Sequence, residues 1–507
     1  MKLTKILGLC AAVALMLCSC SSKNVALEQM IPADAIGVIS INVPEILDKS
    51  TILQDGKLKL PESLSAIIDE NDTSPLGMLV RDFPDSGIST DTKAYLFFTN
   101  KTFLGVAVAS LSDAGKTKEV ITRRTAEVFK THKNGIDYIY HNGILYAIKD
   151  KVLLMGRTHK KADEEMAISA AVRYVAKPAK NALSDDLIKK TIDADEAINA
   201  YMQQQGVKLL LKQSTAYRDI AQKFPLVEIF TESDIQAITC HIALNDDSAE
   251  LKADIIAPDN SQYDQLLATT LSEADNSFLK AIPGSMSYIG MMSVKGENFV
   301  QLPQIQQLTT LFSQLPYIGR INLNEILSTI DGPIAIAAAQ DPHLEGEWNG
   351  VIAARTTNPN LILRQISTFA TMMGQAPEIY DGEYVYQYDN KMIKLGVIDK
   401  ILYVKMLDYE QTEGYAFENE SLKSLFSNCP IGFFAATEHG NFDLVFPNVR
   451  KIAGTFSPKA DGTPATLALL QALCSIKPAG DFENYEDDEA LMVAPSGTAI
   501  DALRPVE

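Results

Sequence analysis

Histidine, cysteine and tryptophan are scarce in this chain of 507 residues, which has six histidines, six cysteines and one tryptophan. None of the histidines belongs to an HxH or HExxH pattern, so the sequence carries no recognisable zinc motif. The GxGxxG and Walker phosphate-binding motifs are absent, as is the GxSxG motif of α/β-hydrolases. These absences remove the common nucleotide-binding enzymes and serine hydrolases from consideration, and we expect no cofactor and no metal.

A framework of disulfides is also excluded. Three cysteines lie at the very start of the chain, and the other three stand far apart and form no CxxC motif: Cys10, Cys18 and Cys20, then Cys240, Cys429 and Cys474. Small secreted domains that depend on disulfides carry many more cysteines than this. One bridge among the last three remains an open alternative, which the spacing alone does not decide.

Long apolar segments are absent too, because no stretch reaches the 18 or more residues that a membrane-spanning helix needs. The longest runs from Ile6 to Leu17, after Lys2 and Lys5, and leads into Leu17-Cys18-Ser19-Cys20. A basic start, a short apolar stretch and a small residue before a cysteine are typical of a bacterial lipoprotein signal. We therefore expect residues 1–19 to be a signal peptide, residues 20–30 to be a tether, and lipid on Cys20 to attach the protein to a membrane.

The charge of the chain is strongly negative. It has 45 basic and 64 acidic residues, which gives −19, and loss of Lys2 and Lys5 with the signal changes this to −21. Such a charge repels nucleic acid and anionic lipid surfaces, so we expect no nucleic-acid partner. The net negative charge fits a soluble domain that is held in a compartment by its lipid.

The order of sequence patterns is repeated along the chain. A phrase that begins with Ile-Pro and runs into a strand occurs at 31–43 and again at 282–294. Five further segments recur in the same order, and the separations of the six pairs range from about 240 to 251 residues. These pairs are 91–98 and 331–338, 103–109 and 348–354, 116–132 and 358–373, 138–142 and 386–390, and 150–154 and 399–403. Six matches in one order predict a duplicated unit.

Each repeat mixes strands and helices without strict alternation. Asn142-Gly143 and the segment 245–248 are typical of hairpin turns, and helices are expected at 116–132, 263–279, 302–315 and 358–373. We predict an α+β fold with two similar duplicated subdomains, each with an antiparallel sheet and packed helices. The predicted units are residues 31–275 and 276–475, followed by an acidic, flexible tail at 476–507.

The start of the predicted mature chain has a family resemblance. A lipoprotein signal, a short tether and the segment Ile31–Asn42, followed by Leu47-Asp48-Lys49-Ser50, resemble an uncharacterised family of exported Bacteroidetes lipoproteins of similar length. The resemblance implies a lipid on Cys20 and no assigned activity. Surface-exported lipoproteins of that phylum often carry acidic residues after the cysteine, whereas Ser21-Ser22-Lys23-Asn24-Val25 has none. We therefore expect the outer membrane, with the protein facing the periplasm.

Several segments suggest chemistry, but each has a simpler interpretation. The loop 341–347 contains His343 and three carboxylates, and we expect a polar turn there rather than a metal site. Ser277-Phe278-Leu279-Lys280 matches SxxK without the companion motifs of penicillin-binding enzymes. Cys240 and His241 are neighbours on a predicted strand and so point to opposite faces, which favours a buried thiol over a nucleophile. The acid-rich segment 481–489 lacks the spacing of a calcium loop.

Aromatic residues near predicted turns could stack on sugars. They are Tyr138, Tyr140, Tyr384, Tyr386 and Tyr388. Their spacing of two residues favours one face of a strand instead. Trp348 opens an apolar segment and is expected in the core.

No catalytic residues are assigned from the sequence. The leading hypothesis is a non-enzymatic binding or assembly module of the cell envelope, with a membrane attachment at Cys20 and an envelope protein or polysaccharide as partner. The alternative is an envelope hydrolase of glycans or peptides whose acidic catalytic residues are dispersed along the chain.

Overall fold

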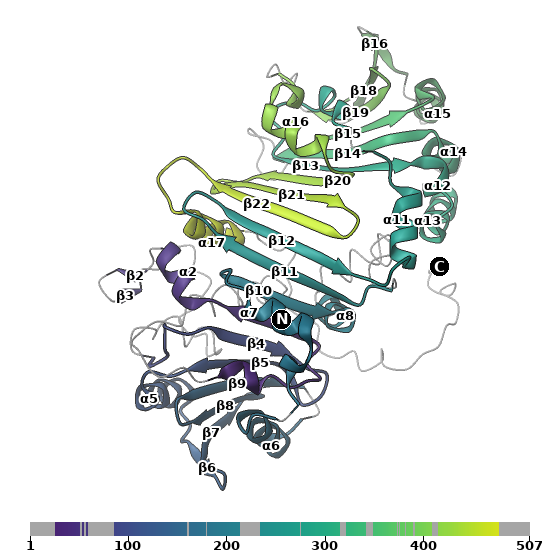
Figure 1. The fold of residues 1–507 in the computed structure, drawn as a ribbon. Coiled ribbons are helices and arrows are strands. Elements are labelled where there is room, and N and C mark those ends of the chain that lie inside the picture. Colours follow the sequence, from purple (N-terminus) through teal and green to yellow (C-terminus); the bar gives the residue numbers. More distant parts are fainter. Residues whose placement is uncertain are drawn as a thin grey trace, which may run out of the picture.

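A single large sheet organises the molecule. The computed structural model describes residues 26–50, 53–54, 57–58, 86–159, 162–178, 180–212, 234–273, 275–314, 321–340, 348–372, 374, 376–380, 382–388, 391–407 and 414–475. Within these ranges an antiparallel sheet of 20 strands carries helices on both faces (Figure 1). The fold is therefore α+β with antiparallel pairing, as predicted. A separate small sheet pairs β2 (Leu53–Gln54) with β3 (Lys57–Leu58).

The first half of the chain supplies one side of the sheet. Its strands are β1 (Gly37–Ile41), β4 (Ala94–Phe98), β5 (Phe103–Ser110), β6 (Lys130–His132), β7 (Ile136–His141), β8 (Ile144–Lys149), β9 (Val152–Thr158), β10 (Ile198–Gln203), β11 (Ala237–Leu244) and β12 (Ala249–Ile256). From the outer edge inward they pair in the order β6-β7-β8-β9-β5-β4-β1-β10-β11-β12.

The second half supplies the other side. Its strands are β13 (Tyr288–Lys295), β14 (Ile330–Gln340), β15 (Trp348–Thr356), β16 (Glu378–Tyr380), β17 (Glu383–Tyr388), β18 (Lys391–Ile398), β19 (Ile401–Leu407), β20 (Ile431–Ala436), β21 (Gly440–Asn448) and β22 (Lys451–Pro458). From the other outer edge inward they pair in the order β16-β17-β18-β19-β15-β14-β13-β20-β21-β22.

The two sides meet where β12 pairs with β22 along Ala249–Asp254. The spatial order of the strands, counted from the outer edge, is the same in both halves. Each strand of one half therefore has a counterpart at the same position in the other. Figure 1 shows the strands stacked from β6 at the bottom to β16 at the top. The pairing register makes this correspondence specific: Leu96 lies between Ile39 and Ala107, as Ile336 lies between Gly290 and Ile352.

Directly opposed residues of neighbouring strands share a face of the sheet, which defines two faces. The Val351 face carries Ile289, Ala337 and Val351 in the second half, and the Ile336 face carries Gly290, Ile336 and Ile352. In the first half the corresponding residues of the Val351 face are Val38, Phe97 and Val106, and those of the Ile336 face are Ile39, Leu96 and Ala107.

Helices cover parts of both faces. The helices of the first half are η1 (Leu27–Met30), α2 (Val43–Ser50), α5 (Ala114–Thr125), α6 (Glu164–Val175), η3 (Ala182–Ser184), α7 (Asp186–Asp193), α8 (Gln204–Lys212) and α11 (Gln262–Thr270). Those that follow are η4 (Ser277–Lys280), α12 (Gly296–Phe299), α13 (Pro303–Ser313), α14 (Leu323–Ser328), α15 (Pro359–Met372), η6 (Ala416–Glu418), α16 (Glu420–Ser427) and α17 (Ala465–Ser475).

Several helices begin at an acidic or amide side chain that accepts backbone N–H groups of the first turn. Asp113, Asp163, Asp185 and Asn419 have this role in α5, α6, α7 and α16. Such caps satisfy donors that the helix itself leaves without acceptors. The sequence prediction of a helix over 116–132 is wrong at its end, because Ala126 adopts a φ of 58° and terminates α5, and β6 follows. The predicted helix over 263–279 likewise ends at Thr270.

The cores lie between these helices and the sheet. On the Val351 face, α6 and α7 pack over Val38 and Phe97 in the first half. Phe278 of η4 and Phe426 of α16 do the same over Ile289 and Val351 in the second. On the Ile336 face, α2 and α17 cover the first half near the junction, and α12 to α14 cover one end of the second half. One part of this face in the second half is left uncovered.

Arg450, in the turn between β21 and β22, joins the second half to α11. Its Nε donates to Asp264 Oδ1 at 2.9 Å and its Nη2 donates to the Pro258 carbonyl at 2.8 Å. The hydrogen bond from Arg450 lowers the pKa of Asp264 below its ordinary value of 3.8. Because that pKa is depressed in the folded state, the pair stabilises the protein above pH 3.8, and the contribution is lost as the pH falls through the lowered pKa.

We expect Arg450→Ala to lower the melting temperature at neutral pH by a small amount, since the pair is partly solvent-exposed. The deficit relative to wild type should shrink as the pH is lowered through the pKa of Asp264. Thermal unfolding of both proteins followed by circular dichroism over the acid range measures this. A deficit that is the same at every pH would show that the ion pair is not the cause.

Candidate binding surface

Six large apolar side chains lie exposed together on the Ile336 face of the second half. They come from five neighbouring strands, and between 37% and 60% of each is exposed: Tyr288, Ile336, Trp348, Ile352, Met406 and Phe433. Their positions in the register place them on one face, because Phe433, Gly290, Ile336 and Ile352 are opposed in a row, and Tyr288, Gly350 and Met406 belong to the next row. We call these six residues the apolar patch.

Small residues separate the large ones. Gly290, Ala338 and Gly350 lie between Tyr288, Ile336, Trp348 and Ile352 on the same face. A Cβ added at Gly290 or Gly350 would meet its nearest neighbour at 3.8 or 3.9 Å, so the backbone does not require glycine at either place. Their small side chains separate the large ones, and the Tyr288 and Trp348 ring centroids are 5.9 Å apart.

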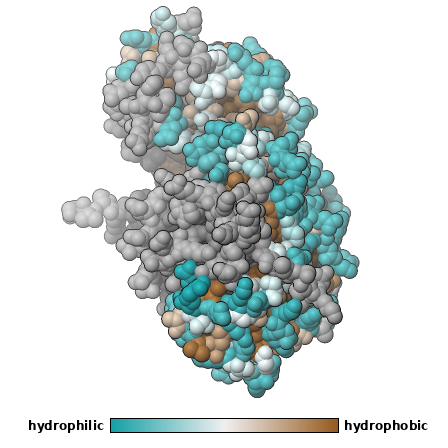
Figure 2. All heavy atoms as spheres, turned by 90° about the vertical axis from the view of Figure 1, so that its left-hand side faces the viewer, coloured by the Kyte–Doolittle hydropathy of each residue, from teal (hydrophilic) through white to brown (hydrophobic). Residues whose placement is uncertain are grey.

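On the described strands that carry the patch, the side chains of this face are uncharged. Every second residue of a strand lies on this face, and on the five strands of the patch these residues are all apolar except Gln340. The segments are 288–292, 334–340, 348–354, 402–406 and 431–435. Exposed apolar areas of this kind on soluble proteins mark places where another molecule binds. Figure 2 shows apolar atoms at the surface of the upper half, framed by hydrophilic ones.

The counterpart of the patch in the first half is closed. Leu96, which corresponds to Ile336 in the register, is 4% exposed, and Phe98, which corresponds to Ala338, is 7% exposed. Both belong to a small core with Ile36. The same face of the same arrangement of strands is therefore buried in one half and open in the other.

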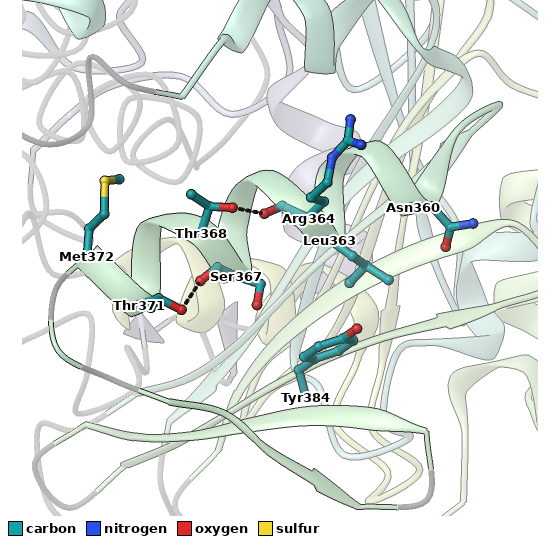
Figure 3. Close-up of a pocket in the computed structure, with 8 residues that line it drawn as sticks. All are labelled: Asn360, Leu363, Arg364, Ser367, Thr368, Thr371, Met372 and Tyr384. Atoms are coloured by element: carbon teal, nitrogen blue, oxygen red, sulfur yellow. Dashed lines mark hydrogen bonds between the residues drawn. The ribbon is translucent and has the colours of Figure 1, made fainter.

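A cavity of about 520 Å³ lies between α15 and β17. Its lining residues are Asn360, Leu363, Arg364, Ser367, Thr368, Thr371, Met372 and Tyr384. Figure 3 shows Leu363 and Ser367 on the side of α15 toward Tyr384, whereas Arg364 extends away from Tyr384. Thr368 and Thr371 donate their hydroxyls to the Arg364 and Ser367 carbonyls of the same helix. The volume is in the range of small-molecule sites.

The cavity and the patch share a face of the sheet. Tyr384 is directly opposite Leu395, Leu395 is opposite Val404, and Val404 is opposite Ile352. Two residues further along β17, Tyr386 is 5% exposed, and its hydroxyl has no hydrogen-bond partner among the residues that the structure describes. A buried hydroxyl without a partner is costly, so it is uncommon in folded proteins.

The residues with suggested chemistry are not brought together. Ser277 and Lys280 lie in η4, where Lys280 Nζ contacts Asp399 Oδ2 at 2.5 Å rather than the serine. His241 Nδ1 lies 2.7 Å from Asn199 Oδ1, while Cys240 pairs with Ala200 and Ala253 on the opposite face. The described residues contain no group of three or more His, Cys, Asp or Glu placed to hold a metal.

Other positions lie beyond what the structure describes. These are the loop 341–347 with His343, the acid-rich segment 481–489, Cys20 and the side chain of Cys474. Tyr138 and Tyr140 share a face of β7, and Tyr384 and Tyr386 share a face of β17, as their spacing predicts. No helix among the described residues is long and apolar enough to span a membrane.

The prediction for Trp348 is wrong. It lies in the patch rather than the core, and 46% of it is exposed. The exposed patch itself was missed too. Apolar residues at both odd and even positions of β14 and β15 are typical of strands buried on both faces, and nothing local distinguishes a strand whose second face stays open.

Glu45 and Glu196 are two carboxylates whose charges interact. Burial raises the pKa of Glu45, and the charge of Glu196 raises it further. The side-chain amide of Asn42 donates to the Glu45 carboxylate at 3.0 Å. Lys93 Nζ donates at 2.6 Å to the carbonyl of Ala194, two residues before Glu196. Glu45 lies at the start of α2 and Glu196 just before β10, whereas the cavity described above lies beside α15.

Both cysteines with described side chains are poor nucleophiles. Burial raises the pKa of Cys240 and of Cys429 to about 11. Only roughly a thousandth of each thiol is ionised at pH 8, and the thiolate is the reactive form.

We expect iodoacetamide at pH 8 to leave both sites unlabelled in the folded protein and to label both in urea, as read by peptide mass spectrometry. Rapid labelling of Cys240 in the folded state would contradict this environment.

The chain matches no family model and no curated protein. Among solved structures, crystal form III of TP0453 is 10% identical and covers 46% of this chain and 80% of its own, with a TM-score of 0.31. Crystal form I of TP0453 is 11% identical over the same shares, with a TM-score of 0.29. The H. pylori β clamp with 5-chloroisatin is 9% identical, covers 83% of this chain and 99% of its own, and has a TM-score of 0.12. Similarity this low assigns neither fold nor function, so the function has to be inferred from the chain itself.

Proposed function

We propose that this protein is a non-enzymatic binding module of the cell envelope and that the apolar patch is the surface that holds its partner. The observation that carries the proposal is the contrast between Ile336, which is 60% exposed, and its counterpart Leu96, which is 4% exposed. Fully burying one fully exposed large apolar side chain stabilises by about 1.5–3 kcal/mol, and covering these side chains, which are 37–60% exposed, would gain a fraction of that. Six such side chains side by side therefore favour a bound state.

The proposed attachment is lipid on Cys20. It is supported by the basic start, the short apolar stretch and the small residue before the cysteine at the beginning of the sequence. The resemblance of Ile31–Asn42 to exported Bacteroidetes lipoproteins supports the same location. We place the protein at the outer membrane, facing the periplasm, where a lipid anchor would hold the binding surface close to the bilayer.

We also infer that the two halves are duplicated units. Their equal strand order supports this, and so do matching contacts outside the strands. The Ala182 amide donates to the Ile31 carbonyl at 2.9 Å, and the Ala416 amide donates to the Ile282 carbonyl at 2.8 Å. A duplication explains why one copy keeps a closed face while the other is available for binding.

Photo-crosslinking in intact cells tests the binding function. A photoreactive phenylalanine analogue is placed at Ile336 or Ile352 of the full-length protein, and the products are isolated through a tag. The matched control is the same residue at Val128, which is 79% exposed but lies between α5 and β6 in the first half. We expect discrete adducts from the patch positions and none from Val128. Equal yields at all three positions, or none at any, would contradict a binding role for the patch.

A further inference from the structure

The second half carries a cluster of polar side chains on the Val351 face, which is the face opposite to the apolar patch. Lys405 of β19 lies between Val351 and Lys394, which are opposed to it on the two neighbouring strands. Tyr403 lies two residues before Lys405 and so shares its face, as does Glu383 of β17. The Tyr403 hydroxyl donates to the Glu383 carboxylate. Charged and hydroxyl groups are therefore gathered in one place on the sheet.

The first half has an ordinary core at the same place. The counterparts in the register are Gly156 for Lys405 and Leu145 for Lys394. Leu145 is completely buried and belongs to the core that α6 covers. The connection between β19 and η6 is too short to hold a helix of the length of α6. One half therefore keeps a helix-covered apolar core where the other carries two lysines directly opposite each other.

Lys405 is buried without a hydrogen-bond acceptor. It is 7% exposed, and its Nζ lies 4.2 Å from the centroid of the Tyr403 ring and 5.2 Å from that of the Tyr415 ring. Among the residues that the structure describes, Nζ forms no hydrogen bond and no ion pair. Ring contacts offset only part of the cost of taking an ammonium out of water. Tyr415 is itself 46% exposed, so the amine lies one side chain below the surface.

These surroundings favour the uncharged amine. Burial lowers the pKa of Lys405 below its ordinary value of 10.5, the charge of Glu383 opposes this shift, and the charge of Lys394 adds to it. A neutral amine is a nucleophile, and desolvation or a neighbouring cation is how a lysine becomes one near neutral pH. An anionic ligand fits less well, because it would need the charged lysine and would lie on the same face as Glu383.

We propose that Lys405 binds a small aldehyde or ketone covalently, as an imine. The lone pair of Nζ forms a bond to the carbonyl carbon, the carbonyl oxygen leaves as water with the two hydrogens of the amine, and a C=N bond remains. The step needs no oxidant and no reductant. It is independent of the proposed role of the apolar patch, because the two lie on opposite faces of the sheet.

Reductive trapping of the imine tests the proposal. The full-length protein is incubated with acetaldehyde and cyanoborohydride, which reduces an imine to a stable amine, and each lysine is quantified by peptide mass spectrometry. Lys252 is the internal control, because its side chain is 71% exposed. At pH 7 we expect Lys405 to be modified about tenfold faster than Lys252, the effect of one unit of pKa on the fraction of neutral amine. At about pH 10.5 this advantage should disappear, because a lysine in water is then about half neutral.

The neighbouring charge provides a matched pair of variants. Lys394→Met should slow the modification of Lys405 at pH 7 about threefold and leave it unchanged at high pH, because it removes a like charge. Lys394→Arg keeps the charge and should behave as wild type does. Equal slowing by Lys394→Met at both pH values would show an effect of packing and would contradict the charge-based account of the amine.

Full modification of Lys252 with none of Lys405 would show that Lys405 is a buried structural lysine, and the inference would be overturned. Neither result bears on crosslinking from the patch, so the proposed function is tested separately.

Discussion

Ile336→Asp is expected to lower binding at the apolar patch about a hundredfold and to leave the unbound protein folded. Ile336 is 60% exposed, so a carboxylate there stays hydrated until a partner covers it. Covering it then requires removing water from an unpaired charge, which costs several kcal/mol, and about 2.7 kcal/mol already corresponds to a hundredfold loss of affinity. The change is measured as the loss of crosslinks from Ile352.

The control for this variant is Val128→Asp, which introduces the same charge at an exposed apolar residue of the first half. Surface substitutions of this kind change stability by no more than about 0.5 kcal/mol, so both variants should melt close to wild type. Wild-type affinity in Ile336→Asp would remove the patch from the binding surface. A large drop in melting temperature would show instead that Ile336 is covered in the unbound protein.

Phe278→Ala is expected to cost about 3–5 kcal/mol in the free energy of unfolding. Phe278 of η4 is fully buried, and its ring meets that of Phe426 edge-on, with centroids 5.3 Å apart and planes at 77°. Removing the ring leaves a cavity between η4, α16 and the Val351 face of the second half. Such a loss is a large part of the 5–15 kcal/mol that stabilises a typical domain.

The matched control is Phe278→Leu. Leu27 of η1 holds the corresponding place in the first half and is also buried. Keeping most of the apolar volume should cost less than about 1.5 kcal/mol. Urea unfolding followed by far-UV circular dichroism measures both losses. Equal losses for the alanine and leucine variants would mean that the site does not tolerate any repacking.

Much of the local structure could be predicted from the sequence because it depends on local chemistry. Asn142-Gly143 and the segment 245–248 form the expected hairpin turns, and Asn142 and Gly143 have φ of 50° and 71°. The continuous apolar run at 94–98 predicts a strand buried on both faces, and all five residues of β4 are buried. Turn residues and apolar runs act over a few positions, so a single sequence contains them.

The binding surface could not be predicted, because exposure of a strand face depends on what packs over it. β14 has the same kind of apolar sequence as β4, yet Ile336 is exposed where Leu96 is buried. The cavity depends on α15 lying beside Tyr384, and the two are brought together by the pairing of β17 with β18 and β19. No motif marks either feature. Comparing the two halves position by position reveals the exposed surface and the cavity only when the exposure of each strand residue is known from the structure.

Acrylamide quenching of Trp348 in the purified full-length protein, without ligand, is the most direct test of an open apolar surface in the second half. With 46% of its side chain exposed, the indole ring should be quenched strongly and emit at a wavelength typical of a solvated tryptophan. Weak quenching with emission at short wavelength, unchanged by Ile336→Asp, would show that the patch is closed by the protein itself and would contradict the account.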